Sequence, residues 1–195
     1  MPELADRDEE WPVVRSEDLH RDDWVVALRA DWLQRPGHPD DQPFKRLVLE
    51  HPGAVVIVAV DDQQRVFCLW QYRHPAGRRF VELPAGLLDV AGEDPLEAAR
   101  RELREEAGLE ASDWTALTTT YSSPGISGEL LHYFVARGLS AADRDDFVAE
   151  HEEAEMQTGW VPAADLLAAA VDGALGDAHT VIALLMAQAR GLLEV

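Results

Sequence analysis

The chain has very little cysteine and no long apolar run. Its 195 residues include a single cysteine, Cys68, so no disulfide can form within the chain. Because Cys68 lies in an apolar run, we expect a buried, inert thiol rather than a nucleophile. No segment reaches the roughly 18 consecutive apolar residues of a membrane-spanning helix, and the acidic start lacks the apolar core of a signal peptide. These absences predict a cytoplasmic protein without membrane contact.

Positive charge is also scarce. The chain has 37 acidic and 17 basic residues, a net charge of −20, and Lys45 is its only lysine. Such a balance disfavours nucleic-acid binding. An acidic protein can still bind an anionic substrate where metal ions and a few arginines reverse the potential locally. The charge therefore favours metal dependence, although solubility alone explains most of the surface acids.

Length and composition predict one main domain with an accessory segment. An apolar content of 47% is enough for a substantial core. Residues 1–42 contain one predicted strand, Trp24 to Leu33, followed by a turn-rich loop. We therefore expect an accessory β segment over 1–42 and the main domain over 43–195.

The main domain alternates strands with a few helices, which predicts an α/β fold with a mixed sheet between helices. The β-branched run Gly53 to Val60 is typical of a strand buried on both faces, and Val66 to Tyr72 is predicted as its hairpin partner. Further strands are expected over 44–50, 79–83, 114–121, 130–136 and 159–161, and helices after Pro162 and from about Ala178.

The clearest helix prediction covers residues 95–107. Asp94 is suited to the N-cap, Pro95 to the first helical position and Glu97 to a capping box, while Gly108 is a typical stop. Apolar residues recur at helical spacing between these ends, at Leu96, Ala99, Leu103 and Ala107.

Three carboxylates share one side of this helix. Glu102, Glu105 and Glu106 stand at positions i, i+3 and i+4, so they can converge on one point. Crowded like charges, one of them beside the apolar stripe, require a cation as partner, either an arginine or a metal ion. A solvated helix with ion pairs such as Arg101 with Glu105 is the simpler alternative.

The order of residues around this helix resembles the signature of the Nudix hydrolase family, GX5EX7REUXEEXGU. One departure exists, because six residues rather than five separate Gly86 from Glu93. The longer loop weakens a role for Gly86 but leaves the helical spacing intact. The matching positions are Glu93, Arg101, Glu102, Leu103, Glu105, Glu106, Gly108 and Leu109.

Two further segments, QYRHP at 71–75 and ELPAGLLD at 82–89, resemble the ADP-ribose pyrophosphatase branch of this family. The resemblance implies a Nudix α/β/α sandwich and a site for Mg²⁺, with Mn²⁺ as a substitute, held by Glu102, Glu105, Glu106 and the carbonyl of Ala85. Hard carboxylate and carbonyl oxygens suit these ions. It assigns Arg73 to the substrate diphosphate, for which a guanidinium fork is suited.

The resemblance also implies a catalytic base in the acidic run 149–156. Glu152 is the first candidate and Glu153 the second, with Arg101 in a supporting catalytic role. Next to them, His151 is interpreted as an incidental loop residue. Glu129, in the turn-rich loop SSPGISGE, is the candidate for a contact with the sugar of the substrate.

By this resemblance the chain is expected to hydrolyse the pyrophosphate bond of ADP-ribose to AMP and ribose 5-phosphate, as a homodimer joined through the N-terminal segment. One rival is the same chemistry on another nucleoside diphosphate sugar, a dinucleotide or an oxidised nucleoside triphosphate. Another is a non-catalytic Nudix module that senses a nucleotide sugar. Trp24 or Trp32 could stack on the base, although core packing is the favoured explanation for both.

Overall fold

The computed structural model describes residues 4–144 and 155–194, and its backbone divides into two compact units. One unit comprises Met1–His51 with Ser123–Glu129, and the other comprises Pro52–Ser122 with Leu130–Val195. The division falls later than the 42/43 boundary expected from the sequence, because the strand after that boundary pairs within the first unit. None of the helices in the described ranges is long and apolar enough to cross a membrane.

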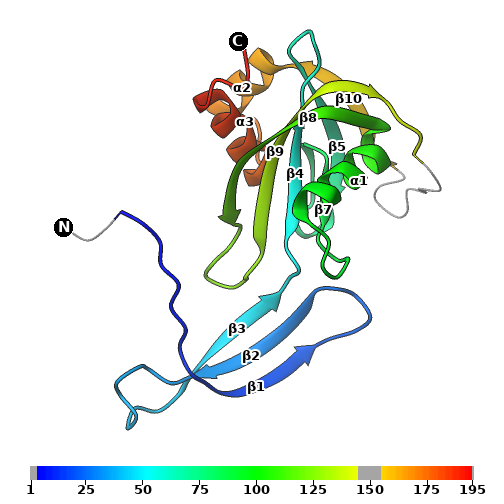
Figure 1. The fold of residues 1–195 in the computed structure, drawn as a ribbon. Coiled ribbons are helices and arrows are strands. Elements are labelled where there is room, and N and C mark those ends of the chain that lie inside the picture. Colours follow the sequence, from blue (N-terminus) through cyan, green and yellow to red (C-terminus); the bar gives the residue numbers. More distant parts are fainter. Residues whose placement is uncertain (1–3, 145–154, 195) are drawn as a thin grey trace. The chain divides into compact units, whose positions relative to one another are not determined.

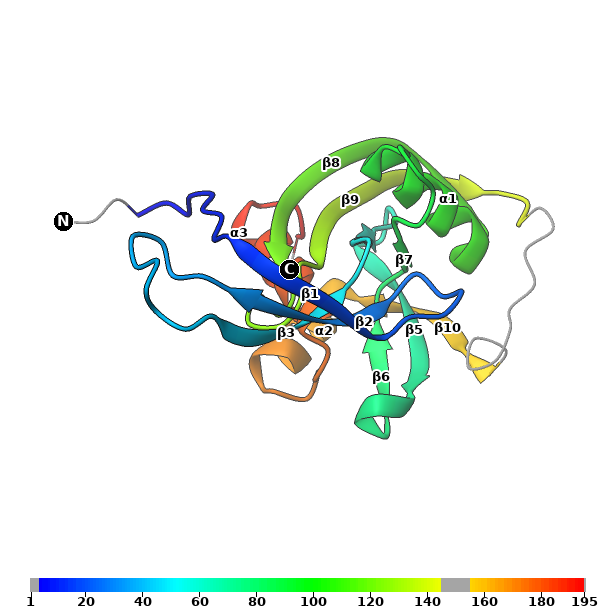
Figure 2. The same ribbon diagram turned by 90° about the horizontal axis from the view of Figure 1, so that it is seen from below.

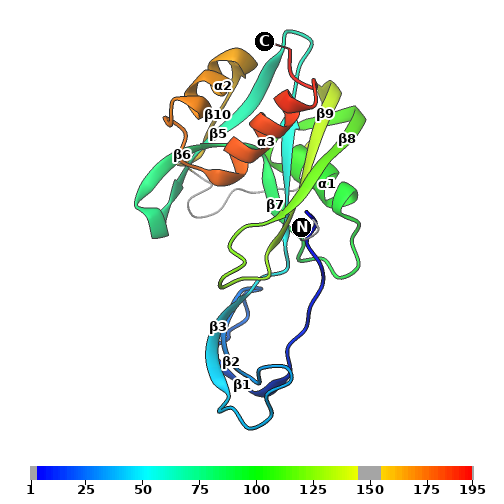
Figure 3. The same cartoon turned by 90° about the vertical axis from the view of Figure 1, so that its left-hand side faces the viewer.

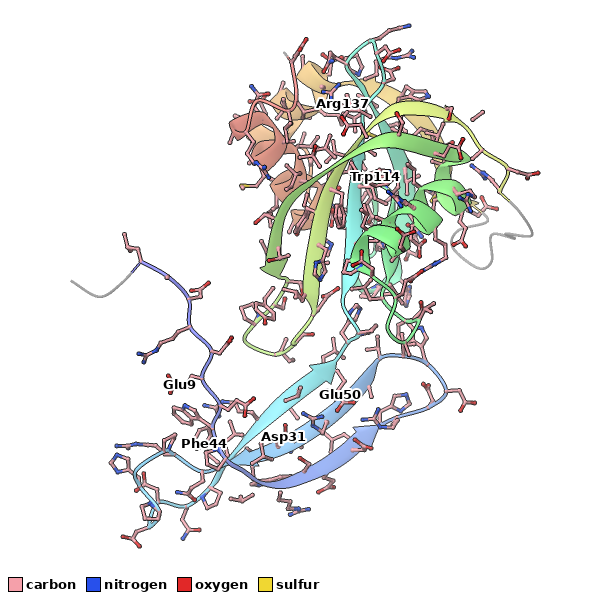
Figure 4. The ribbon with its side chains drawn as sticks, in the orientation of Figure 1. Glu9, Asp31, Phe44, Glu50, Trp114 and Arg137 are labelled. Carbon is pink, nitrogen blue, oxygen red and sulfur yellow. The ribbon has the colours of Figure 1, made fainter. Side chains whose placement is uncertain are left out.

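The first unit is an antiparallel sheet in the order β1-β2-β3. Its strands are β1 (Val13–His20), β2 (Ala27–Leu33) and β3 (Phe44–Glu50). The loop 123–129 joins β3 through a hydrogen bond from the Leu49 N–H to the Ile126 carbonyl (2.8 Å). Charged side chains connect neighbouring strands, since Arg29 on β2 forms ion pairs with Asp31 and with Glu50 of β3 (Figure 4). Every residue of β1 is exposed, which explains why an apolar pattern does not reveal this strand.

The described residues of the second unit form two sheets, the helices α1, α2 and α3, and the short 3₁₀ helix η1. One sheet has the order β7-β4-β9-β8 and is mixed, because β4 and β9 are parallel; the other is antiparallel, in the order β10-β5-β6 (Figure 2). The elements are β4 (Ala54–Ala59), β5 (Arg65–Arg73), η1 (His74–Ala76), β6 (Arg78–Glu82), β7 (Ala85–Leu87), α1 (Pro95–Ala107), β8 (Leu109–Tyr121), β9 (Leu130–Ala141), β10 (Gln157–Pro162), α2 (Ala163–Val171) and α3 (Ala178–Ala189).

Strand β4 is the centre of the core, as its apolar run predicts. All six of its residues are buried, and because successive side chains point to opposite faces, the strand serves two core clusters. Val56 and Val58 belong to the cluster that includes α2 and α3, whereas Val55 and Ile57 belong to the cluster that includes α1. Helices therefore cover both faces, in an α/β/α sandwich (Figure 1 and Figure 3).

The predicted hairpin between β4 and β5 is wrong beyond its turn. Only a single bridge, Val60 to Val66, joins the two chain segments around a turn in which Gln64 has a φ of 55°. Strand β4 pairs with β7 on one edge and with β9 on the other, so no edge remains for β5. Strand β5 consequently pairs with β6 and β10 in the second sheet.

Candidate active site

Helix α1 has the limits that its sequence predicts. The Asp94 carboxylate accepts a hydrogen bond from the Leu96 N–H (2.9 Å), Pro95 begins the helix, and Gly108 ends it with a left-handed φ of 63°. Glu97 pairs with Arg100 (2.7 Å) on the exposed face. The buried face is mixed, because it contains Glu102 and Glu106 beside three apolar residues, Ala98, Ala99 and Leu103.

Glu102 is a buried carboxylate that packs directly on Gly86 of β7. A Cβ atom at Gly86 would lie 1.9 Å from the Glu102 Cδ atom, so any larger residue there would require the Glu102 carboxylate to move. Loss of hydration raises the pKa of Glu102 to about 7, while Arg101, whose Nη1 donates a hydrogen bond to Oε1 (2.6 Å), opposes that rise and Glu105 adds to it. A buried anion of this kind lacks sufficient positive charge.

Glu106 contacts Ala85, the residue of β7 that precedes Gly86. The Ala85 N–H donates a hydrogen bond to its Oε2 atom (2.9 Å), and the residue is 8% exposed. Arg144 donates a hydrogen bond to the backbone carbonyl of Glu106 (2.8 Å), which adds a partner near the end of the helix. Strand β7, which follows β6, therefore contacts two of the three predicted metal ligands. Gly86 contacts Glu102, and Ala85 contacts Glu106.

Arg101 joins the preceding loop to the helix. Its Nη2 atom donates to Glu93 (3.1 Å), and its Nη1 atom is shared by Glu102 (2.6 Å) and Glu105 (3.3 Å). The hydrogen bond to Glu93 is the largest contribution that raises the pKa of Arg101, so its charge is fixed. This network brings together four residues that the signature contains, and it keeps three carboxylates around one guanidinium.

Arg73, at the end of β5, forms a two-pronged contact with Glu82 at the end of β6. Its Nε atom donates to Oε1 (3.0 Å) and its Nη2 atom donates to Oε2 (2.7 Å). Glu82 is 7% exposed, whereas the Arg73 side chain is 49% exposed. Hydrogen bonding to Glu82 raises the pKa of Arg73 against the opposing effect of burial, and Glu106 and Asp177 add to the rise through space.

The carboxylate oxygens on α1 are suitable ligands for a hard divalent cation, although they are not already arranged around one position. Within the described parts of the chain, no three Asp, Glu, His or Cys side chains are close enough to hold a metal ion together. Glu102 and Glu105 are instead linked to Arg101. The raised pKa of buried Glu102 nevertheless indicates an uncompensated carboxylate, and carboxylate oxygens are the ligands that Mg²⁺ prefers.

The other residues that the sequence singled out are found in different parts of the chain or outside the described residues. Glu129 belongs to the first unit, where its carboxylate lies 3.5 Å from the His51 ring. Glu152 and Glu153 lie outside the described residues, as does His151. Cys68 is fully buried in the core, and burial raises the pKa of its thiol to about 12, which is the behaviour of an inert residue.

Sequence reasoning gave no role to Glu82 and only a weak one to Gly86. Two features of the sequence could have indicated Glu82. It stands four residues before Gly86, and it is the last residue of β6, whose neighbouring strand β5 ends at Arg73. The signal for Gly86 was a glycine inside a three-residue strand, where close approach of another side chain is a common reason for that residue.

The site combines buried carboxylates on α1 with the guanidinium of Arg73, on an α/β/α sandwich. This combination is suited to a phosphate-bearing anion and the cation that accompanies it. The comparisons with known proteins agree with this class. The model of the NUDIX domain matches residues 50–183, and the chain belongs to this family.

Two relatives and one solved structure are similar to most of the chain. An ADP-ribose pyrophosphatase of Mycobacterium tuberculosis is 47% identical over 83% of this chain and 74% of its own length. A methanol dehydrogenase activator of Bacillus methanolicus is 39% identical over 64% of this chain and 68% of its own length. The crystal structure of an ADP compounds hydrolase has the same fold, with a TM-score of 0.76 and 21% identity over 96% of this chain and 98% of that one.

Proposed function

We propose that the protein is a Nudix pyrophosphohydrolase that cleaves the pyrophosphate bond of ADP-ribose to AMP and ribose 5-phosphate with Mg²⁺, for which Mn²⁺ substitutes. The observation that carries the proposal is the pair of buried carboxylates, Glu102 and Glu106, on one helix, of which Glu106 interacts electrostatically with Arg73. The relationship to the mycobacterial ADP-ribose pyrophosphatase supports the choice of substrate.

The residues present can be assigned to a metal site. Glu102, Glu105 and Glu106 would hold the ion together with the carbonyl of Ala85, and the bound ion would polarise the phosphoryl oxygens and lower the pKa of a bound water. Arg101 orients Glu102 and Glu105, because one of its nitrogens donates to both.

Three further residues complete the proposed chemistry. Arg73 contacts the diphosphate through the part of its guanidinium that Glu82 leaves available. Glu152, with Glu153 as the alternative, accepts a proton from the attacking water. Glu129 contacts the sugar. These assignments follow the family resemblance and can be separated by single substitutions to glutamine, or to lysine for Arg73.

The test is a substrate panel. Phosphate-bond cleavage is measured with ADP-ribose, ADP-glucose, NADH and 8-oxo-dGTP, each with Mg²⁺ and with EDTA, and the products are separated by ion-exchange chromatography. We expect AMP and ribose 5-phosphate from ADP-ribose at the highest kcat/KM, and no cleavage with EDTA. A higher kcat/KM for another nucleotide would replace ADP-ribose by that substrate, and cleavage that persists in EDTA would contradict metal dependence.

The second candidate function is a catalytically silent module that binds a nucleotide sugar and regulates a partner. The specific observation in its favour is the relative from Bacillus methanolicus, which is described as an activator of an enzyme. The intact set of acidic residues on α1 favours catalysis instead. Tight binding of ADP-ribose by calorimetry, without Mg²⁺-dependent cleavage, would support the silent module.

We also propose a cytoplasmic homodimer in which the N-terminal sheet forms the contact between subunits. Strand β1 is exposed along its whole length, and the first unit exposes many large apolar side chains, which is unusual for a surface that stays in water. Light scattering at micromolar concentration should give twice the mass of one chain, and a monomer would contradict this proposal. Among the described residues of the first unit, the exposed large apolar residues are Leu4, Trp11, Val13, Val14, Leu19, Trp24, Val25, Leu47 and Ile126.

A further inference from the structure

The contact between Arg73 and Glu82 uses only one side of the guanidinium. An arginine has five N–H donors, which form two forks, one on Nε and Nη2 and the other on the two Nη atoms. Glu82 accepts from Nε (3.0 Å) and from Nη2 (2.7 Å), which occupies the first fork. The second fork is the one that matches paired phosphate oxygens, and the half-exposed side chain can present it to a ligand.

Glu82 carries a negative charge into a site that is proposed to bind an anion. If Arg73 served only to attract the substrate, a buried carboxylate in contact with it would weaken that attraction. Glu82 is nevertheless 7% exposed and bound to Arg73 through both of its oxygens, so it restrains the guanidinium in position and direction. The geometry is therefore suited to orienting the arginine rather than to increasing its charge.

Glu82 also belongs to a short segment that contacts both parts of the site. Within residues 82–86, Glu82 binds Arg73, the Ala85 N–H binds Glu106, and Gly86 packs on Glu102. The segment itself is fixed to the core, because the Ile57 N–H of β4 donates a hydrogen bond to the Pro84 carbonyl (2.9 Å). One piece of backbone thus sets the position of the arginine relative to the acidic helix.

We infer that Glu82 is a positioning residue, which holds Arg73 by its Nε and Nη2 edge so that the remaining fork binds the diphosphate at a fixed distance from the acidic residues of α1. This inference rests on the proposed function, since it takes a diphosphate as the ligand. It adds a residue to the site and gives a reason for a carboxylate beside an anion-binding arginine.

The experiment measures the affinity of a diphosphate that is not cleaved. Calorimetry with α,β-methylene-ADP, with Mg²⁺ and with EDTA, is applied to the wild type, Glu82→Gln, Arg73→Ala and the double variant. We expect Glu82→Gln to bind the probe about tenfold more weakly, the size associated with a misaligned charge-assisted hydrogen bond. In the Arg73→Ala background, Glu82→Gln should cause no further loss, because the residue acts through the arginine. Glu97→Gln makes the same change of charge as Glu82→Gln on the exposed face of α1 and should bind like the wild type.

Other outcomes overturn the inference. Tighter binding by Glu82→Gln would mean that Glu82 only neutralises Arg73, and unchanged binding would mean that the contact only stabilises the fold. An equal loss in both backgrounds would show that Glu82 acts without Arg73. If Glu82→Gln does not fold, Arg73→Lys gives the same test, because lysine keeps the charge but cannot form two forks; unchanged affinity there would overturn the inference.

The failure of the proposed function would be visible separately. If the wild type binds α,β-methylene-ADP but does not cleave ADP-ribose, the hydrolase proposal is contradicted. The affinities of the wild type and the variants for the probe can still be compared. A wild type that does not bind the probe overturns the inference itself, because Arg73 then has no diphosphate to orient.

Discussion

The protein contains two networks of arginine and carboxylate groups, and their electrostatic states are opposite. In the N-terminal sheet, Arg29 of β2 pairs with Asp31 of the same strand and with Glu50 of β3, and its hydrogen bonds hold the pKa of Asp31 below the ordinary value. Figure 4 labels Asp31 and Glu50. On α1, Arg101 faces Glu93, Glu102 and Glu105, and burial raises the pKa of Glu102 to about 7. In the first network the arginine stabilises the charged form of its acid, whereas in the second the effect of burial on Glu102 exceeds that of Arg101.

The difference separates a structural network from a functional one. Ion pairs that stabilise a fold lower the pKa of their acids, because the folded state favours the charged form. A site that keeps a buried acid partly uncompensated is costly to the folded protein, and such a cost is typical of a binding or catalytic site. Substitutions in the two networks should therefore affect different properties.

The largest effect should come from Glu106→Gln. Glutamine can still accept the hydrogen bond from the Ala85 N–H, so the fold should persist, but the charge that a cation needs is lost. We expect kcat for ADP-ribose to fall by at least about a hundredfold, the size seen when one electrostatic contact at a reacting centre is removed. Steady-state kinetics with circular dichroism measures both properties. A folded variant with wild-type turnover would remove Glu106 from the site.

The second effect concerns stability without metal. Because the folded pKa of Glu102 is about 7, above the ordinary value of 4.5, the ionised side chain costs stability as the pH rises through this interval. Glu102→Gln should therefore raise the free energy of unfolding in EDTA by on the order of 1 to 3 kcal/mol at about pH 8. The gain should vanish near pH 4. Urea unfolding at both pH values tests this, and a loss of stability at pH 8 would make the α1 network structural.

The third effect should have the opposite sign. Asp31 accepts two hydrogen bonds from Arg29 (2.9 Å each) and one from Ser16 (2.6 Å). Asp31→Asn removes the negative charge and replaces one of the two acceptor oxygens by an NH₂ group, so at least one hydrogen bond from Arg29 is lost or weakened. We expect the free energy of unfolding to fall by about 1 kcal/mol at neutral pH. Since the folded pKa of Asp31 is lowered, its contribution is present above the ordinary value of 3.8 and is lost as the pH falls through the folded pKa. Urea unfolding of variant and wild type should therefore converge in acid, and a difference that grows there would contradict the sign.

The smallest effect should come from an exposed pair. Glu97→Gln removes the partner of Arg100 on the solvent side of α1. We expect a change below about 0.5 kcal/mol in the free energy of unfolding and an unchanged kcat. The variant is a control for Glu106→Gln, because it makes the same chemical change in the same helix. A large loss of activity would show that any charge on α1 matters, regardless of its place.

The sequence predicts those parts of the fold that depend on local signals. The limits of α1 follow from Asp94, Pro95 and Gly108, and the burial of β4 follows from its β-branched run. Strand β1 is not predicted, because its residues are exposed and follow no apolar alternation. The sheet partners of β5 are also beyond local patterns, since they depend on which edges β4 has already used.

The same distinction applies to the candidate site. The spacing of Glu102, Glu105 and Glu106 places them on one helix, and the structure buries two of them. The contact of Arg73 with Glu82 depends on the register between β5 and β6, and the contact of Gly86 with Glu102 depends on how β7 packs on the helix. Neither contact is visible in the order of residues. The assignments of Glu129, Glu152 and Glu153 remain predictions.

The contact at Gly86 also explains why the loop can be longer than the family signature without harm. Gly86 is fixed by the carboxylate that fills the space of a side chain, and Glu93 is fixed independently by Arg101. Leu87 pairs with β4, and the Leu88 N–H donates a hydrogen bond to the Gly53 carbonyl (3.0 Å), so the part of this segment that can vary in length is the exposed stretch 90–92. Residues can therefore be inserted between positions 90 and 92, whereas even one methyl group at Gly86 would displace a proposed metal ligand.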